Sequence, residues 1–428
     1  MTTAASTLST LFIAALAATT LLRIWLGLRH VSHVARHRAA VPDAFRNAIG
    51  LAAHQKAADY TIARVRLGLV DVSTGALLTV WFTLGGGLQM IFDLCSGMFE
   101  IGGYAHSIAF IGIVSLVGFL VGLPFVVWRT FVVEERFGFN KMTPALFFAD
   151  LAKEALLAVC VGVPLLAAVL WLMEHMGSLW WLHVWLVWLT FNLLVLLIYP
   201  TFIAPLFNKF SPLDDASLRQ RIETLLARCG FRSSGLFVMD GSRRSAHGNA
   251  YFTGFGAAKR IVFFDTLLAK LTPQEIEAVL AHELGHFRHH HVWQRLGVLG
   301  LASLAFLALL GYLIAQPWFF EGLGMSSRGT AVALVLLMLV VPVFVFPLSP
   351  LMSGWSRKHE FQADAYAARQ TRGEDLVSAL VKLYRDNAAT LTPDPLYSTF
   401  HDSHPPAAAR IAHLQTVATG GARLAVQP

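Results

Sequence analysis

The hydrophobic positions of this 428-residue chain gather into seven long apolar runs, separated by shorter polar segments. Each run approaches the roughly 20 residues that an α-helix needs to cross a bilayer core. The pattern predicts a mostly helical, multi-pass membrane protein with seven transmembrane helices, at 6–28, 67–94, 106–128, 155–173, 179–204, 296–316 and 329–352. The first run could instead be a cleaved signal peptide, since Ala15, Leu16 and Ala17 resemble a cleavage site, but no Lys or Arg precedes its apolar part.

The only long polar stretch lies between the fifth and sixth runs. It predicts a small α/β unit, with a helix in "DASLRQRIETLLARCGF" and strands in "GLFVMD" and "NAYFTGFGAAKRIVFF", the last being a hairpin that turns near Gly256. The chain therefore divides into helices one to five (1–204), the α/β segment (205–295), helices six and seven (296–352) and a C-terminal segment (353–428).

Two helices near the last two runs bear on chemistry. Thr272, Pro273 and Glu275 form the start signal of a capped helix, and no breaker follows, which predicts one helix from Pro273 into the sixth run. Three prolines should kink or end the seventh run near its polar end. The segment after it, "SRKHEFQADAYAARQ", again predicts a helix.

Composition and charge agree with a membrane protein: 56% of residues are hydrophobic and only 14% are charged. Lys and Arg alternate between successive loops, which places the N-terminus outside and the C-terminus in the cytoplasm. The net charge of +7 then reflects topology, and nucleic acid is not an expected partner. Three unpatterned cysteines indicate neither a disulfide framework nor a thiolate metal site.

The segment "HELGH" carries the candidate chemistry. His282 and His286 lie four residues apart on the predicted helix, so both imidazoles project from one face and can hold one Zn²⁺. Glu283 lies beside them, where it can act as a general base without occupying a coordination position. Taken alone, the pattern also fits a helix that collects histidines at a membrane interface.

A third ligand is expected on the helix that follows the seventh apolar run. The short 317–328 loop makes helices six and seven antiparallel, which returns Glu360 to the level of His282 and His286. Asp364, one turn beyond, can then accept the free N–H of a ligand histidine. The alternative for Asp364 is an ordinary solvated helix carboxylate.

Other classes of metal-binding protein fit the sequence less well. A metzincin needs His where the chain has Val292. A site-2-type protease needs an Asp-Gly pair in a later membrane segment, whereas Asp240 and Gly241 precede the histidines. A transporter or lipid-handling protein with a structural metal stays open, although such a site does not require an acid at Glu283.

Six segments together resemble the CAAX prenyl protease 1 family, which consists of integral-membrane zinc endopeptidases with a glutamate as third ligand. They are "HQKAADYTIARVR" from His54, "EERFGFNKMTPALFFAD" from Glu134, "GSRRSAHGNAYFTGFG" from Gly241, "HELGHF" from His282, "SRKHEFQADAYA" from Ser356 and "SHPPAAARI" from Ser403. The resemblance implies a hollow, barrel-like chamber of seven helices. It also implies His282, His286 and Glu360 as zinc ligands and Glu283 as the catalytic base.

The same resemblance implies active-site roles for three more residues, Asn249, His404 and Arg410. Asn249 begins a candidate edge strand that can hold an extended peptide by β-augmentation. His404 or Arg410 would stabilise the oxyanion.

The expected partners are the bilayer and peptide or membrane-protein substrates, including prenylated CAAX-type peptides. The compact, alanine-rich chain looks bacterial, which suggests an inner-membrane location. Since bacteria are not expected to make prenylated CAAX proteins of their own, a membrane-protein quality-control protease without prenyl specificity is an alternative. For His289, His290 and His291 two hypotheses stay open: an interfacial cap near lipid headgroups, or a role for one of them beside the zinc or the chamber.

Overall fold

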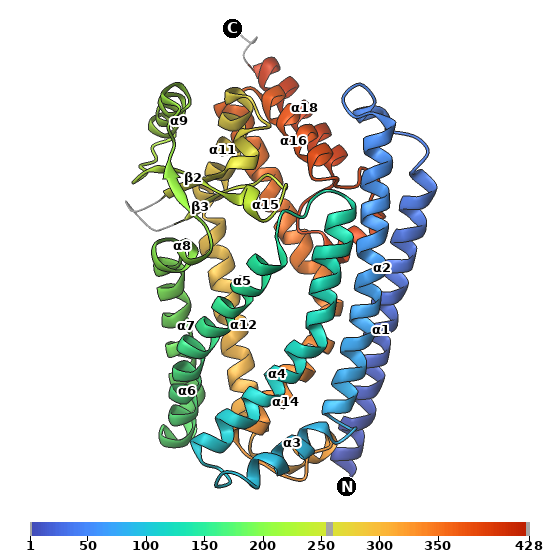
Figure 1. Ribbon diagram of the computed structural model, residues 1–428, viewed down its shortest axis with the longest axis vertical. Coiled ribbons are helices and arrows are strands. Elements are labelled where there is room, and N and C mark those ends of the chain that lie inside the picture. Colours follow the sequence, from blue (N-terminus) through green and yellow to red (C-terminus); the bar gives the residue numbers. More distant parts are fainter. Residues whose placement is uncertain (1, 254–259, 425–428) are drawn as a thin grey trace.

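The computed structural model describes residues 2–253 and 260–424 and is mostly helical (Figure 1). Seven helical segments are long and apolar enough to span a membrane: Thr3–His37, Leu51–Phe82, Tyr104–Glu134, Pro144–His175, Gly177–Phe207, His291–Leu313 and Thr330–Gln370. The helices within and between them are α1 (Thr3–His37), α2 (Leu51–Phe82), α3 (Gly87–Ser96), α4 (Tyr104–Trp128), α5 (Pro144–Leu157), α6 (Val163–His175), α7 (Trp180–Ile198), α8 (Ala204–Phe207), α12 (His291–Leu313), α13 (Pro317–Gly322) and α14 (Thr330–Val345). The predicted number of spans is confirmed.

The second predicted span is displaced by about half its length. Residues 83–94 belong to a turn and to the short helix α3, while α2 extends back through the polar segment that begins at Leu51. Gly86 has φ 78, a left-handed conformation that favours glycine and allows the sharp turn into α3. Hydropathy alone placed the span too late because the N-terminal half of α2 carries several charged side chains.

Buried apolar side chains gather at the two ends of the molecule. One cluster joins the start of α1, the end of α2, α3, the start of α4, the end of α12 and α13 near the N-terminus in Figure 1, together with residues of α6 and α7, and it continues along α14 as far as Val343. It includes Phe12, Phe82, Leu88, Phe110, Leu310 and Phe320. A second cluster lies at the opposite end, among the helices and strands of the α/β unit. The spans connect the two clusters.

The middle of the barrel is open. In the most apolar 18-residue windows of the second to fifth spans, only 6%, 11%, 11% and 0% of residues are buried. A helix in a solid bundle buries a stripe at least 100° wide, so these helices leave both faces uncovered. The spans therefore enclose a hollow chamber, which confirms the predicted fold class.

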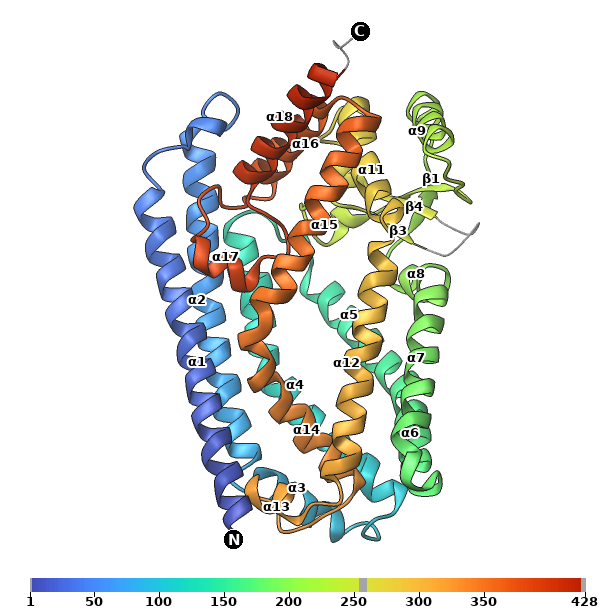
Figure 2. The ribbon, with the colours of Figure 1, turned by 180° about the vertical axis from the view of Figure 1, so that it is seen from behind.

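The α/β unit caps one end of this chamber (Figure 2). It contains β1 (Phe210–Pro212), α9 (Ala216–Arg228), β2 (Leu236–Met239), β3 (Ala250–Thr253), β4 (Arg260–Phe264), α10 (Asp265–Leu268) and α11 (Pro273–Arg288). The four strands form one sheet in the order β1-β2-β4-β3, with β2 parallel to β4 and the outer pairs antiparallel. The predicted helix and strands are confirmed, while the turn expected near Gly256 lies outside the described residues.

The remaining helices come from the C-terminal segment. They are α15 (Ser349–Gln370), α16 (Gly373–Asp386), α17 (Pro395–His401) and α18 (Ala407–Leu424). A 3₁₀ turn at Phe346–Leu348 separates α14 from α15, as the prolines predicted. Because α15 continues the direction of the last span, it carries the segment from Ser356 onward up beside α11 (Figure 2).

The predicted capping box of α11 is present. Thr272 Oγ1 accepts a hydrogen bond from the backbone N–H of Glu275, and the Glu275 carboxylate accepts one from the backbone N–H of Thr272. The prediction of an uninterrupted helix into the membrane is wrong. α11 ends at Arg288 and α12 begins at His291, because His290 adopts a left-handed conformation with φ 57.

Replacing Glu275 by alanine is expected to destabilise the α/β unit by about 3 kcal/mol, as the loss of one partner from a buried ion pair does. The Glu275 carboxylate is 5% exposed and accepts hydrogen bonds from Lys382 Nζ and Ser378 Oγ, both at 2.7 Å. Thermal unfolding of the purified protein measures the change. Glu277→Ala is the control, since Glu277 pairs with exposed Arg221 and should contribute less than about 1 kcal/mol; equal shifts would contradict the prediction.

Candidate metal centre

The centre lies where α11 and α15 pack with almost no space between their backbones. A Cβ placed on Gly285 would lie 2.8 Å from Ala363 Cα and 3.1 Å from its carbonyl oxygen. Ala281 and Ala367, on the same two faces, are also fully buried. Small side chains let two helices approach closely, and this contact brings the third candidate ligand within reach of the HELGH helix.

The three predicted ligands converge on one point. His282 Nε2 lies 3.5 Å from Glu360 Oε2, His286 Nε2 lies 3.4 Å from Glu360 Oε1, and the two Nε2 atoms lie 3.3 Å apart. The ligand atoms of the three residues all lie within 4.8 Å of one another, a spacing that can hold a single metal ion.

Two further observations fit a bound cation. Glu360 is 2% exposed, and its Oε2 atom accepts no hydrogen bond within the described part of the chain, although Arg410 Nη1 lies 3.7 Å from it. A buried carboxylate oxygen without a hydrogen bond can accept a metal ion as its partner. Burial lowers the pKa of His282, but Asp364 and Glu360 outweigh it and raise that pKa to about 9. The negative electrostatic potential of these two carboxylates, which favours a proton on His282, also favours a metal cation. Two imidazoles and one carboxylate are a typical ligand set for Zn²⁺.

Asp364 supports His282 from behind. Its Oδ1 atom lies 2.8 Å from His282 Nδ1, so it accepts the N–H that a ligand histidine leaves free. Asp364 is fully buried rather than solvated. Arg410 Nε donates to Asp364 Oδ2 at 2.8 Å, and the guanidinium also lies 3.3 Å from His282 Nδ1. Arg410 is 6% exposed, so it faces the ligands and not the open chamber.

Glu283 and His404 are on the open side. Glu283 is partly exposed and has no hydrogen bond or ion pair with any residue that the structure describes, which leaves its carboxylate available to a water molecule. His404 Nε2 lies 3.4 Å from Glu360 Oε1, and its side chain is 62% exposed. Both residues can therefore contact a molecule that enters the chamber.

Asn249 precedes the edge strand of the sheet. Among the described strands, β3 pairs only with β4, so its other edge is available to an added strand. Phe252 in β3 contacts Phe287 of α11, with ring centroids 5.1 Å apart, and this holds the strand beside the helix that carries His286. Asn249 is exposed, and its backbone carbonyl accepts a hydrogen bond from Phe264 N–H.

Comparison with known proteins covers both halves of the chain. Residues 30–209 match "CAAX prenyl protease N-terminal, five membrane helices", and residues 212–418 match "Peptidase family M48". The "CAAX prenyl protease 1 homolog" of Caenorhabditis elegans is 31% identical over 94% of this chain and 97% of its own length, and that of Arabidopsis thaliana is 39% identical over 72% of each. The chain belongs to the CAAX prenyl protease 1 family.

A solved structure extends the family assignment to the architecture. The crystal structure of S. mikatae Ste24p superposes with a TM-score of 0.89 and 30% sequence identity, covering 95% of this chain and 99% of that one. The family resemblance predicted from the motifs is thus confirmed, and membership of a metallopeptidase family implies a metal. A transporter with a structural metal is not favoured.

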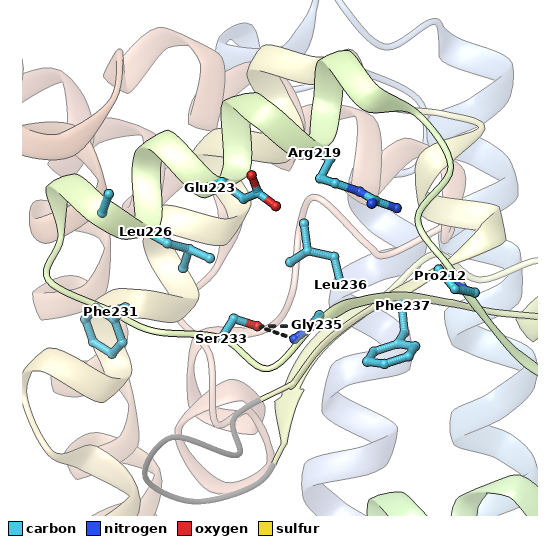
Figure 3. A pocket seen from close by; sticks show the side chains of 10 residues that line it. Pro212, Arg219, Glu223, Leu226, Phe231, Ser233, Gly235, Leu236 and Phe237 are labelled. Atoms are coloured by element: carbon cyan, nitrogen blue, oxygen red, sulfur yellow. Dashed lines mark hydrogen bonds between the residues drawn. The ribbon is translucent and has the colours of Figure 1, made fainter.

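A separate cavity of about 440 Å³ opens on the α/β unit of this CAAX prenyl protease 1 family member (Figure 3). It lies between α9, which contributes Arg219 and Glu223, and the strand residues Leu236 and Phe237. Ser233 hydrogen-bonds both the N–H and the carbonyl of Gly235 at its rim. None of the predicted site residues lines it, so it is distinct from the metal centre.

Sequence reasoning overlooked the part of Gly285 in forming the site. The signal was present, because Ala278, Ala281 and Gly285 repeat at helical spacing, as do Ala363 and Ala367 on the facing helix. Such a row of small residues predicts a close helix contact. The partner helix could not be identified from the row alone.

Proposed function

We propose that this protein is a membrane-embedded zinc endopeptidase that processes proteins ending in a prenylated CAAX sequence. The observation that carries the chemistry is the convergence of His282, His286 and Glu360 next to Glu283, which has no hydrogen bond or ion pair within the described part of the chain. The substrate class is supported by the relatives, which are named CAAX prenyl proteases. A protease without prenyl specificity is the less favoured alternative.

His282, His286 and Glu360 would hold the zinc. Bound there, zinc would polarise the scissile carbonyl and make the attacking water more acidic. Glu283 accepts the proton of that water and delivers it to the leaving nitrogen, which requires a carboxylate free of other partners. Asp364 keeps His282 in the tautomer that presents Nε2 to the metal, because its carboxylate can only accept a hydrogen bond at Nδ1.

The free edge of β3 would bind the peptide in an extended conformation. Backbone hydrogen bonds to an edge strand orient a substrate regardless of its sequence, and Asn249 lies where the peptide would enter this edge. Of the two residues considered for the oxyanion, the geometry favours His404, which is exposed beside Glu360. Arg410 is hydrogen-bonded to Asp364 and lies 3.7 Å from Glu360 Oε2, so it acts instead by fixing the two carboxylates around His282.

The lipid bilayer is the surrounding partner of the seven spans. The alternation of Lys and Arg between loops supports an N-terminus outside and a cytoplasmic C-terminus, which places the metal centre near the cytoplasmic end. The compact, alanine-rich chain supports a bacterial inner membrane. Four segments follow from this topology: 1–204, 205–295, 296–352 and 353–428.

Hydrolysis of matched peptides tests the proposal. A farnesylated peptide ending in CAAX is expected to be cut with a kcat/KM at least about tenfold above that of the same peptide without the lipid, since each buried CH₂ contributes about 0.8 kcal/mol. A zinc chelator should abolish cleavage and added zinc should restore it. Equal rates on both peptides would favour the protease without prenyl specificity, and no cleavage of either would contradict the proposed activity.

A further inference from the structure

The three consecutive histidines after the HELGH helix have different surroundings. His290 is exposed, and the buried Nε2 of His289 has no hydrogen-bond partner in the described part of the chain. His291 is only 1% exposed, and its Nδ1 atom lies 2.9 Å from Nδ1 of His286. One of the three therefore contacts a candidate metal ligand directly.

The break between α11 and α12 allows His291 to reach His286. Residues five apart on an uninterrupted α-helix point about 140° away from each other, which would direct His291 away from His286. The left-handed conformation of His290 costs roughly 1 kcal/mol for a residue with a Cβ atom. It lets a new helix begin at His291, with the imidazole turned back toward the metal centre.

The hydrogen bonds of His291 assign the tautomers of both rings. His291 Nε2 lies 2.9 Å from Gln362 Oε1, and an amide oxygen can only accept, so His291 carries its hydrogen on Nε2. Its Nδ1 atom then has a lone pair and must accept the hydrogen bond from His286 Nδ1–H. This leaves the lone pair of His286 on Nε2, the atom that faces Glu360.

Helix α15 holds this arrangement from the other side. Gln362 lies two residues after Glu360, and His359, one residue before it, stacks on His291 with centroids 3.9 Å apart and planes at 6°. The same helix thus supplies the third candidate ligand and both supports of His291. Were the Gln362 amide reversed, its NH₂ would donate to His291, and His286 would carry its hydrogen on Nε2, where it could not bind a metal.

We propose that His291 and Gln362 form a hydrogen-bond relay that holds His286 in the Nδ1–H tautomer and so presents its Nε2 lone pair to the metal. His291 is a positioning residue for His286, as Asp364 is for His282. The inference rests on the proposed function in one respect, that His286 is a zinc ligand. It assigns one histidine of the "HHH" segment to the metal centre.

Zinc affinity, measured by competition with a chelator, tests the relay without reference to activity. Gln362→Leu removes the acceptor and is expected to weaken zinc binding about tenfold, and His291→Phe keeps the ring but removes the lone pair and should weaken it about 10- to 100-fold. Gln362→Glu can only accept, so it cannot reverse the relay; it should bind zinc at least as tightly as the wild type. The melting temperature of each metal-free variant shows whether the fold is retained.

His289→Phe is the matched control, because it makes the same substitution two residues away in a side chain that has no hydrogen bond or ring contact with His286 in the described structure. The His289 ring stacks on His291 at 5.5 Å, and phenylalanine keeps that stacking, so the zinc affinity should stay within about threefold of the wild type. Equal losses in His289→Phe and His291→Phe, or a loss in Gln362→Glu as large as in Gln362→Leu, would overturn the relay. His286→Ala separates the two proposals. If it binds zinc as tightly as the wild type, the proposed zinc site fails; if only His286→Ala loses zinc, the relay alone fails.

Discussion

Peptide hydrolysis falls by about 10³-fold or more in Glu283→Gln, while zinc stays bound at one ion per chain. Glutamine has the same shape as glutamate but cannot accept a proton from water. Glu283 lies outside the His282, His286 and Glu360 cluster, so its replacement leaves every candidate ligand in place. Single-turnover cleavage of the farnesylated peptide and metal analysis of the same sample give the two readouts.

Glu277→Gln, on the same helix but paired with arginines away from the metal centre, is the control and should retain wild-type kcat. Loss of zinc together with activity in Glu283→Gln would show that Glu283 supports the metal and is not the base. Cleavage at the wild-type rate would exclude it from the chemistry altogether.

The second large effect is expected from a single methyl group. Gly285→Ala places a Cβ 2.8 Å from Ala363 Cα, a contact that a backbone atom cannot yield without moving α15 away from α11. Glu360 lies one turn before Ala363 and must move with it. Since zinc–ligand distances tolerate only about 0.2 Å and a displacement of about 1 Å can cost 10²-fold in rate, zinc affinity and activity should both fall by about 10²-fold or more.

Gly297→Ala is the matched control, because nothing lies within 4 Å of a Cβ at that position of α12. It should bind zinc and cleave peptide as the wild type does, with a slightly more stable helix. If Gly285→Ala behaves like Gly297→Ala, the close contact between α11 and α15 does not hold the metal centre together.

Much of the fold could be predicted from hydrophobic patterning. Runs of about 20 apolar residues favour membrane-spanning helices, and each of the seven overlaps a helical segment long and apolar enough to span a membrane. Two predictions were wrong, the position of the second span and the uninterrupted helix from Pro273, and in both cases the local backbone conformation ended a helix. Residues 83–94 are apolar enough to extend the second span, but the chain turns at Gly86. Nothing in the histidine run indicated that His290 would take positive φ and end α11.

The candidate ligands could be predicted because helix periodicity and membrane topology can both be inferred from the sequence. His282 and His286 share a face at a spacing of four, and an antiparallel helix pair returns Glu360 to their level. The hydrogen bonds around them could not be predicted in the same way. Arg410 contacts the ligand His282, and Gln362 contacts His291 behind the ligand His286. Both contacts arise from packing between distant segments, since 46 residues separate Arg410 from Asp364.

The placement of the two buried clusters has a consequence for how the wall of the chamber behaves. Free energy from apolar burial is small at mid-membrane along the second to fifth spans, which bury at most 11% of the residues in their most apolar windows, whereas the seventh span buries 44%. Separating two such helices there exposes little new surface to lipid and so costs little. The lateral pressure and thickness of the surrounding bilayer therefore help to keep these spans together. Transfer into short-chain detergent should widen the gaps between the spans before either end unfolds.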